Sequence, residues 1–146
     1  MTEQIDNIIY RLEEYINKAE ELDDKYEFIT PAGEIVNELN LIENNFNAIE
    51  PILKLIERSP DMDYGGPGPL GNFLETHYKK GYEELLLKSI ERQPKEYTLY
   101  LLHRLINDDN NPNRQLYIDL MKRISSSGEY PENIIESAKD SLTYFD

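Results

Sequence analysis

Hydrophobic residues recur along this chain every three or four positions, the spacing that lines one face of an α-helix. The first such stripe consists of Ile5, Ile8, Ile9, Leu12, Ile16 and Ala19. Similar stripes return as far as the C-terminus, and no alternating pattern typical of a strand competes with them. The pattern therefore predicts an all-α fold of about seven or eight short helices.

Turn signals separate the stripes. Thr30-Pro31 predicts a helix start, because proline fits the first helical position, and Asn111-Pro112 predicts another. Short helices joined by turns of roughly two to six residues form antiparallel hairpins. A repeat length of about 35–40 residues further suggests a stack of hairpins like that of HEAT repeats.

One segment, residues 59–71 (SPDMDYGGPGPLG), has no helical pattern and holds four of the 7 glycines and three of the 8 prolines. We interpret this loop as a rigid boundary between two helical parts of a single domain, residues 1–146. On this interpretation, residues 1–58 form acidic N-terminal helices and residues 72–146 form C-terminal hairpins.

The chain is strongly acidic: 29 Asp and Glu face 15 Lys and Arg, which gives a formal net charge of -14. Residues 1–58 hold 14 acidic and 5 basic side chains, a net of -9, and residues 59–146 hold 15 and 10, a net of -5. Such a field repels nucleic acids and anionic membranes and attracts a basic protein surface. We therefore expect neither nucleic acid nor membrane as a partner.

Cysteine is absent, which excludes disulfides and thiolate chemistry and is compatible with a reducing cytosol. The N-terminal segment lacks the basic and apolar regions of a signal peptide, and no apolar run reaches the roughly 18 residues of a membrane span. We expect a cytoplasmic protein.

Candidate catalytic and metal-binding residues are few. His77 and His103 each lie on or beside an apolar stripe with no second ligand at metal-binding spacing, so a structural role is favoured over catalysis. Asp61-x-Asp63 begins like a calcium loop, but Gly65 and Asn72 occupy two ligand positions. The prolines of the loop remove backbone donors that a phosphate would need. We expect no cofactor, no metal and no enzymatic activity.

Tyrosine is abundant, with 11 residues, including Tyr10, Tyr15 and Tyr26 in the acidic N-terminal region and Tyr64 on the loop. Most are expected to be half-buried helix edges. Tyrosine beside carboxylates, however, also suits a basic protein partner, because the ring supplies contact area and the acids pair with Lys and Arg.

The segment from Asp61 to Asn107 resembles small all-helical immunity proteins of bacterial polymorphic toxin systems, including contact-dependent inhibition. The resemblance is carried by DMDYGGPGPLGNFLE, GYEELLLKSIERQP and LLHRLIN. It extends over the C-terminal part of the chain, has no defining active-site motif, and leaves residues 1–58 unmatched. It implies a protein that neutralises one cognate toxin C-terminal domain, and many such toxins are nucleases with basic grooves.

The resemblance supplies no interface residues, so the candidates come from the charge pattern. They are Asp61, Asp63 and Tyr64 on the loop, the turn Asp108-Asp109, and the cluster Glu20, Glu21, Asp23 and Asp24. The acids would pair with toxin Lys and Arg, with Tyr64 as an anchor, and at least one group should be irrelevant because one interface has limited size. The alternatives are a non-catalytic helical-repeat scaffold and, third, an enzyme or small-ligand binder that uses His77 or His103.

Overall fold

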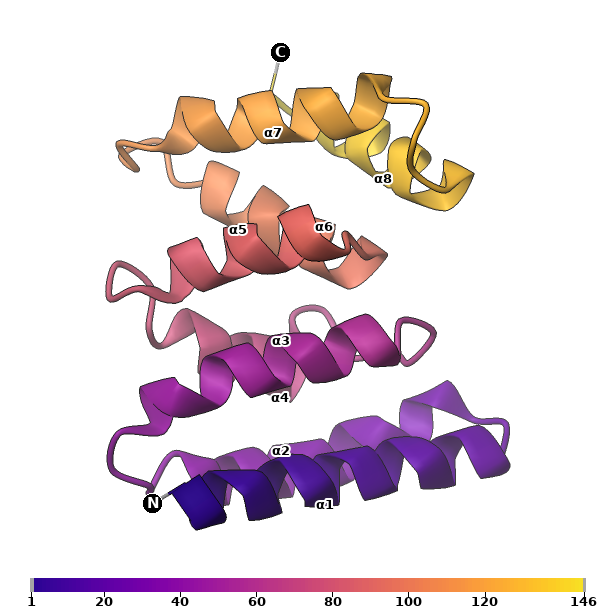
Figure 1. Ribbon diagram of the computed structural model, residues 1–146, viewed down its shortest axis with the longest axis vertical. Helices are drawn as coiled ribbons and strands as arrows, with labels where there is room; N and C mark the ends of the chain where they lie inside the picture. Colours follow the sequence, from indigo (N-terminus) through magenta and orange to yellow (C-terminus); the bar gives the residue numbers. More distant parts are fainter. Residues whose placement is uncertain (1, 146) are drawn as a thin grey trace. The chain divides into compact units, whose positions relative to one another are not determined.

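The computed structural model describes residues 2–145, which form α-helices and short 3-10 helices and no strand (Figure 1). The elements are α1 (Thr2–Glu21), η1 (Lys25–Phe28), α2 (Ile29–Leu39), η2 (Asn45–Ala48), α3 (Ile49–Arg58), α4 (Gly68–Glu75), α5 (Tyr82–Arg92), α6 (Glu96–Ile106), α7 (Arg114–Ser126) and α8 (Glu132–Leu142). The predicted all-α class and helix number are confirmed for the described residues. Whether the hairpins are HEAT-like repeats stays a prediction.

The chain divides into two compact units at Ser89 and Ile90. The sequence analysis put a boundary at residues 59–71, but that loop lies inside the first unit. The physical reason is packing: α4, which follows the loop, packs against α2, which precedes it. Leu70, Phe73 and Leu74 of α4 are buried accordingly.

In the first unit, α1 packs against η1, α2, η2 and α3. The stripe predicted for α1 is its buried face, with only Ile9 half-buried. Arg11 of α1 donates two hydrogen bonds to the carboxylate of Glu38 on α2, at 2.8 and 2.6 Å. The opposite face of α1 is therefore free to carry exposed acidic and tyrosine side chains.

Short 3-10 helices precede α2 and α3, so neither helix begins at a simple side-chain cap. The predicted start at Thr30-Pro31 falls one residue inside α2, which continues from η1 at Ile29. The 3-10 turn η1 buries Phe28 and leaves Tyr26 exposed.

The second unit contains α6, α7 and α8, which all pack against one another. Figure 1 shows α7 and α8 side by side. Their core is made by Leu101, Leu102, Ile106, Met121 and Ala138, each without exposed surface.

Candidate functional site

The C-terminus of α1 turns sharply at Asp23, which adopts the left-handed conformation (φ +53°). The N–H of Asp23 donates to the carbonyl of Glu20 at 3.1 Å, and the N–H of Asp24 donates to that of Ala19 at 3.0 Å. This pair of bonds is a Schellman motif, in which glycine is usual and Asp is one of the few tolerated alternatives. The motif holds four acidic residues, Glu20, Glu21, Asp23 and Asp24, on one tight turn.

Asp24 stabilises the local backbone in addition to carrying a negative charge. Its Oδ1 accepts a hydrogen bond from the backbone N–H of Tyr26 at 3.1 Å and so caps η1. This cap stabilises the turn between α1 and η1.

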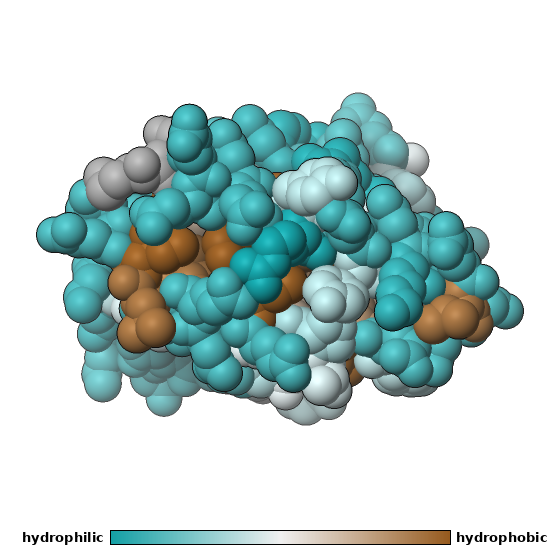
Figure 2. Space-filling view, turned by 90° about the horizontal axis from the view of Figure 1, so that it is seen from below, coloured by the Kyte–Doolittle hydropathy of each residue, from teal (hydrophilic) through white to brown (hydrophobic). Residues whose placement is uncertain are grey.

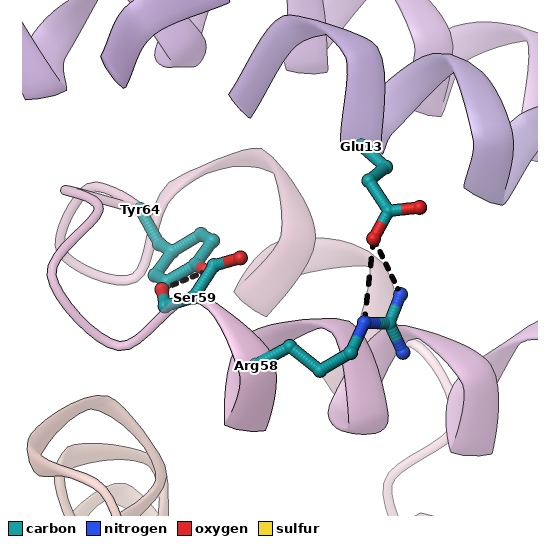
Figure 3. Close-up of polar contacts among 4 residues, drawn as sticks. All are labelled: Glu13, Arg58, Ser59 and Tyr64. Atoms are coloured by element: carbon teal, nitrogen blue, oxygen red, sulfur yellow. Dashed lines mark hydrogen bonds and ion pairs between the residues drawn. The ribbon is translucent and has the colours of Figure 1, made fainter. Parts of the chain in front are cut away.

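The loop after α3 is held to α1 by an ion pair. Arg58 at the end of α3 contacts the carboxylate of Glu13 at 3.0 Å (Figure 3). Farther along, Asp63 accepts a hydrogen bond from the N–H of Gly65 at 2.8 Å. The ion pair thus ties the end of α3 to α1, and the Asp63 contact stabilises the loop itself.

Tyr64 is buried, with 2% of its surface exposed. Its hydroxyl donates to the carbonyl of Ser59 at 2.6 Å (Figure 3), and its ring meets that of Phe28 edge-to-face with centroids 5.6 Å apart. The expectation that Tyr64 anchors a partner is therefore corrected: the loop folds back so that the ring fills the core of the first unit. The acceptor of this hydrogen bond, the Ser59 carbonyl, belongs to the same loop.

The end of α1, η1 and the loop enclose a groove of about 570 Å³, here called the acidic groove. Four of its lining residues are acidic, and two are basic, Lys25 and Arg58. The acidic ones are Glu20, Asp23, Asp24 and Asp61. The structure thus brings together Asp61 of the predicted loop group and three members of the N-terminal cluster, at a groove with a net charge of -2 (four acids, two bases). Arg58 is already paired with Glu13.

The remaining predicted residues lie elsewhere. Glu21 lines a separate shallow hollow of about 620 Å³ along α1, together with Glu14 and Tyr15. Asp108 and Asp109 belong to the second unit, where Asp108 accepts from the N–H of Asn110 and Asp109 lies 3.6 Å from Arg114. Both acids of this turn therefore have local structural contacts.

A second groove of about 370 Å³, here called the tyrosine groove, shares Ala19, Asp24 and Tyr26 with the acidic groove. It is further lined by Tyr15, Lys18, Glu27, Thr30, Pro31 and Glu34. Tyr15 and Tyr26 are 37% and 60% exposed. The sequence analysis noted these tyrosines but did not choose Glu27 or Glu34 as candidate site residues, because their position at the groove depends on how η1 leads into α2.

Figure 2 looks onto the side of the first unit that carries α1 and α2, and hydrophilic residues cover most of this face. Hydrophobic residues gather there in small patches. One hollow of about 510 Å³ is lined by apolar Ile8, Leu41 and Ile42 and polar neighbours that include the Arg11–Glu38 pair. Leu41 is 88% exposed.

The two histidines are engaged in packing contacts. His77 Nε2 lies 3.0 Å from Oδ1 of Asn45, and its ring meets Phe46 and Phe73 edge-to-face. Desolvation, with a smaller contribution from Lys80, lowers the pKa of His77. His103 Nδ1 lies 2.6 Å from Oγ of Ser141, and burial lowers its pKa too.

No group of three or more His, Cys, Asp or Glu side chains within residues 2–145 is arranged to hold a metal ion. None of the helices described here combines the length and the apolar character needed to cross a membrane. In comparisons with known proteins, no family model, no curated protein and no solved structure matches this chain.

Proposed function

We propose that this chain is a cytoplasmic immunity protein that binds the basic toxic domain of a bacterial polymorphic toxin and blocks its active-site groove. The observation that carries the proposal is the convergence of Glu20, Asp23, Asp24 and Asp61 on one groove. Like charges gathered at a hollow surface repel one another in the free protein, and a cationic partner relieves that repulsion. In this proposal the chain performs no catalysis.

The distribution of charge between the two units supports the first unit as the binding part. Residues 1–89 contain 19 acidic and 8 basic side chains, a net of -11, and residues 90–146 contain 10 and 7, a net of -3. A nuclease toxin has a basic groove because it holds phosphates. An acidic inhibitor therefore associates quickly with such a groove and rejects acidic partners.

We assign the principal contact to the acidic groove and not to the Asp108-Asp109 turn. The side chain of Asp109 is 88% exposed and lies near Arg114, while Asp108 caps its own turn. The second unit, which carries this turn, also has a net charge of only -3, against -11 for the first unit. Asp63 and Tyr64 are likewise assigned to the internal structure of the loop.

The hollow beside Leu41 favours a second candidate function, a non-catalytic helical scaffold that recruits a partner through apolar contacts. A leucine that is 88% exposed beside Ile8 and Ile42 is a docking feature that needs no charge. On this alternative the acidity serves solubility, and binding is insensitive to salt.

The proposal expects the gene of a secreted toxin beside that of this chain, and co-expression with the C-terminal toxic domain of that toxin tests it directly. We expect survival of cells that carry both proteins and death of cells that carry the toxin alone. Equal killing with and without this chain would remove the proposal. Survival that is lost in Leu41→Asp but kept when the groove carboxylates are removed would keep the immunity function and assign the toxin contact to the apolar hollow instead of the acidic groove.

Matched charge variants locate the contact. Asp23→Asn with Asp61→Asn removes two charges from the acidic groove, and Asn is tolerated at the left-handed position of Asp23. Asp108→Asn with Asp109→Asn removes the same charge from the second unit and keeps an Asx acceptor at residue 108. We expect the first pair to slow association with the toxin about 3- to 10-fold at low salt and the second to leave it nearly unchanged.

Ionic strength provides the corresponding physical readout. The Debye length falls from about 10 Å at 0.1 M salt to about 3 Å at 1 M, so steered association slows steeply over that range. An association rate that is flat with salt, or two variant pairs with equal effects, would contradict the assignment to the acidic groove.

A further inference from the structure

The tyrosine groove adjoins the acidic groove, and Asp24 and Tyr26 line both. Its composition differs from that of its neighbour, because two exposed aromatic rings accompany the carboxylates. Tyr15 comes from α1, Tyr26 from η1, and Thr30 and Pro31 from the first turn of α2. Each side chain is thus fixed on an element of the first unit.

The net negative charge of the tyrosine groove favours the binding of a cation. Its lining includes the carboxylates of Asp24, Glu27 and Glu34 and the ammonium of Lys18, a net of -2. Glu27 and Glu34 are exposed, so their oxygens are accessible to a ligand from outside. A carboxylate that accepts from a cationic donor makes the stronger class of hydrogen bond.

The ring of Tyr26 already attracts a cation in this structure. The ammonium of Lys25 lies 5.5 Å from its centroid, within the distance of a cation–π contact. Lys25 lines the acidic groove and not the tyrosine groove. The same ring therefore accepts positive charge while contributing to a second groove that has its own carboxylates.

We infer that the tyrosine groove binds an arginine side chain of the basic partner, held against Tyr15 and Tyr26 and paired with Glu27 or Glu34. This inference rests on the proposed function for its partner, but it names a subsite that the proposal does not need. Arginine fits better than lysine because its planar guanidinium stacks on aromatic faces, binds carboxylates in a fork and is more weakly hydrated. Arg and Tyr are also the residues on which interface energy concentrates.

Small probes test the subsite without the toxin. N-acetyl-arginine-N-methylamide is titrated into the full chain, with the lysine and the neutral citrulline analogues as comparisons. Tyrosine resonances are followed by NMR in fluorotyrosine-labelled protein and assigned with Tyr→Phe variants. We expect saturable shifts at Tyr15 and Tyr26, larger for arginine than for lysine and absent for citrulline.

Tyr10 is the matched control, since it lies on α1, is 61% exposed and lines neither groove. Tyr26→Ala should weaken arginine binding about 2- to 5-fold, the change expected for one exposed cation–π contact, while Tyr26→Phe retains most of it. Tyr10→Ala should have no effect. Equal shifts at Tyr10, or equal affinity for the three probes, would overturn the inference.

The experiments distinguish a failure of the arginine subsite from a failure of the proposed function. A chain that protects cells from its toxin but shows no arginine preference at Tyr15 and Tyr26 retains the proposed function and loses the subsite. A chain that binds arginine in this groove but gives no protection retains the subsite and loses the proposed function.

Discussion

Asp24 Oδ1 accepts a hydrogen bond of 3.1 Å from the backbone N–H of Tyr26, so one carboxylate both charges the acidic groove and caps the 3-10 turn beside it. Asp24→Ala should lower the free energy of unfolding by about 1 kcal/mol, because the cap is lost. Asp24→Asn keeps an acceptor of similar capping strength and should be nearly neutral. Urea denaturation of the two variants measures the difference, and equal stability would show that the cap contributes nothing.

The burial of Tyr64 predicts an effect on stability and not on binding. Tyr64→Phe removes the hydroxyl that donates to the Ser59 carbonyl at 2.6 Å and should cost about 1 kcal/mol of unfolding free energy. Affinity for a basic partner should be unchanged, since the ring is 2% exposed. A loss of affinity with unchanged stability would instead restore Tyr64 as an interface anchor.

The spacing of hydrophobic residues predicted the helices well, because helix formation depends on residues that are close in the sequence. The buried face of α1 follows directly from the spacing of Ile5, Leu12 and Ile16, because helical periodicity depends on neighbours three or four positions away. The direction of the Tyr64 ring depends on how the loop folds back onto Phe28, which no local pattern specifies. An exposed-looking loop residue was therefore wrongly interpreted as a surface anchor.

The sequence predicted the acidic residues of the acidic groove but not the groove itself. The sequence identifies Glu20, Asp23 and Asp24 as a cluster and Asp61 as part of a loop, but their meeting at one groove depends on the packing of α3 against α1. The Arg58–Glu13 ion pair is part of that tertiary arrangement. Long-range convergence of this kind becomes visible only in three dimensions.

Lys25 should compete with an incoming cation, because it lines the acidic groove and lies over the ring of Tyr26. Lys25→Gln changes the net charge of the groove lining from -2 to -3, since one of its two bases is lost. Association with a basic toxin domain should then speed up about 2-fold at low salt. Stopped-flow mixing measures the rate, and Lys88→Gln, which removes an exposed charge of α5 outside both groove linings, is the control. An equal gain in both variants would assign the effect to total charge.

Gly81 supports the packing of η2 against the turn before α5. Its φ is +110°, and an added Cβ would lie 3.0 Å from Cζ of Phe46. Gly81→Ala should therefore lower the unfolding free energy by roughly 2–4 kcal/mol, from backbone strain and from displacement of the ring. Gly128→Ala is the matched control, because nothing lies within 4 Å of its added Cβ and its φ is outside the strained range. Thermal unfolding of the two variants should separate them clearly.

The two histidines predict a specific dependence of stability on pH. Burial lowers the pKa of His77 and of His103 below the ordinary value of 6.5, so both rings stay neutral in the folded chain where the unfolded chain takes up protons. Their contribution to stability is complete above pH 6.5 and is lost as the pH falls from there towards the folded pKa values.

The Arg11–Glu38 pair acts at lower pH than the histidines. Arg11 lowers the pKa of Glu38 from its ordinary 4.5, so any loss from that pair begins only near this value. Urea denaturation between about pH 7.5 and 5 should therefore show falling stability. Two-dimensional NMR should show both imidazoles titrating below 6.5. An imidazole that titrates above 6.5 would contradict the burial of that ring, and constant stability across this range would show that its protonation is not coupled to folding.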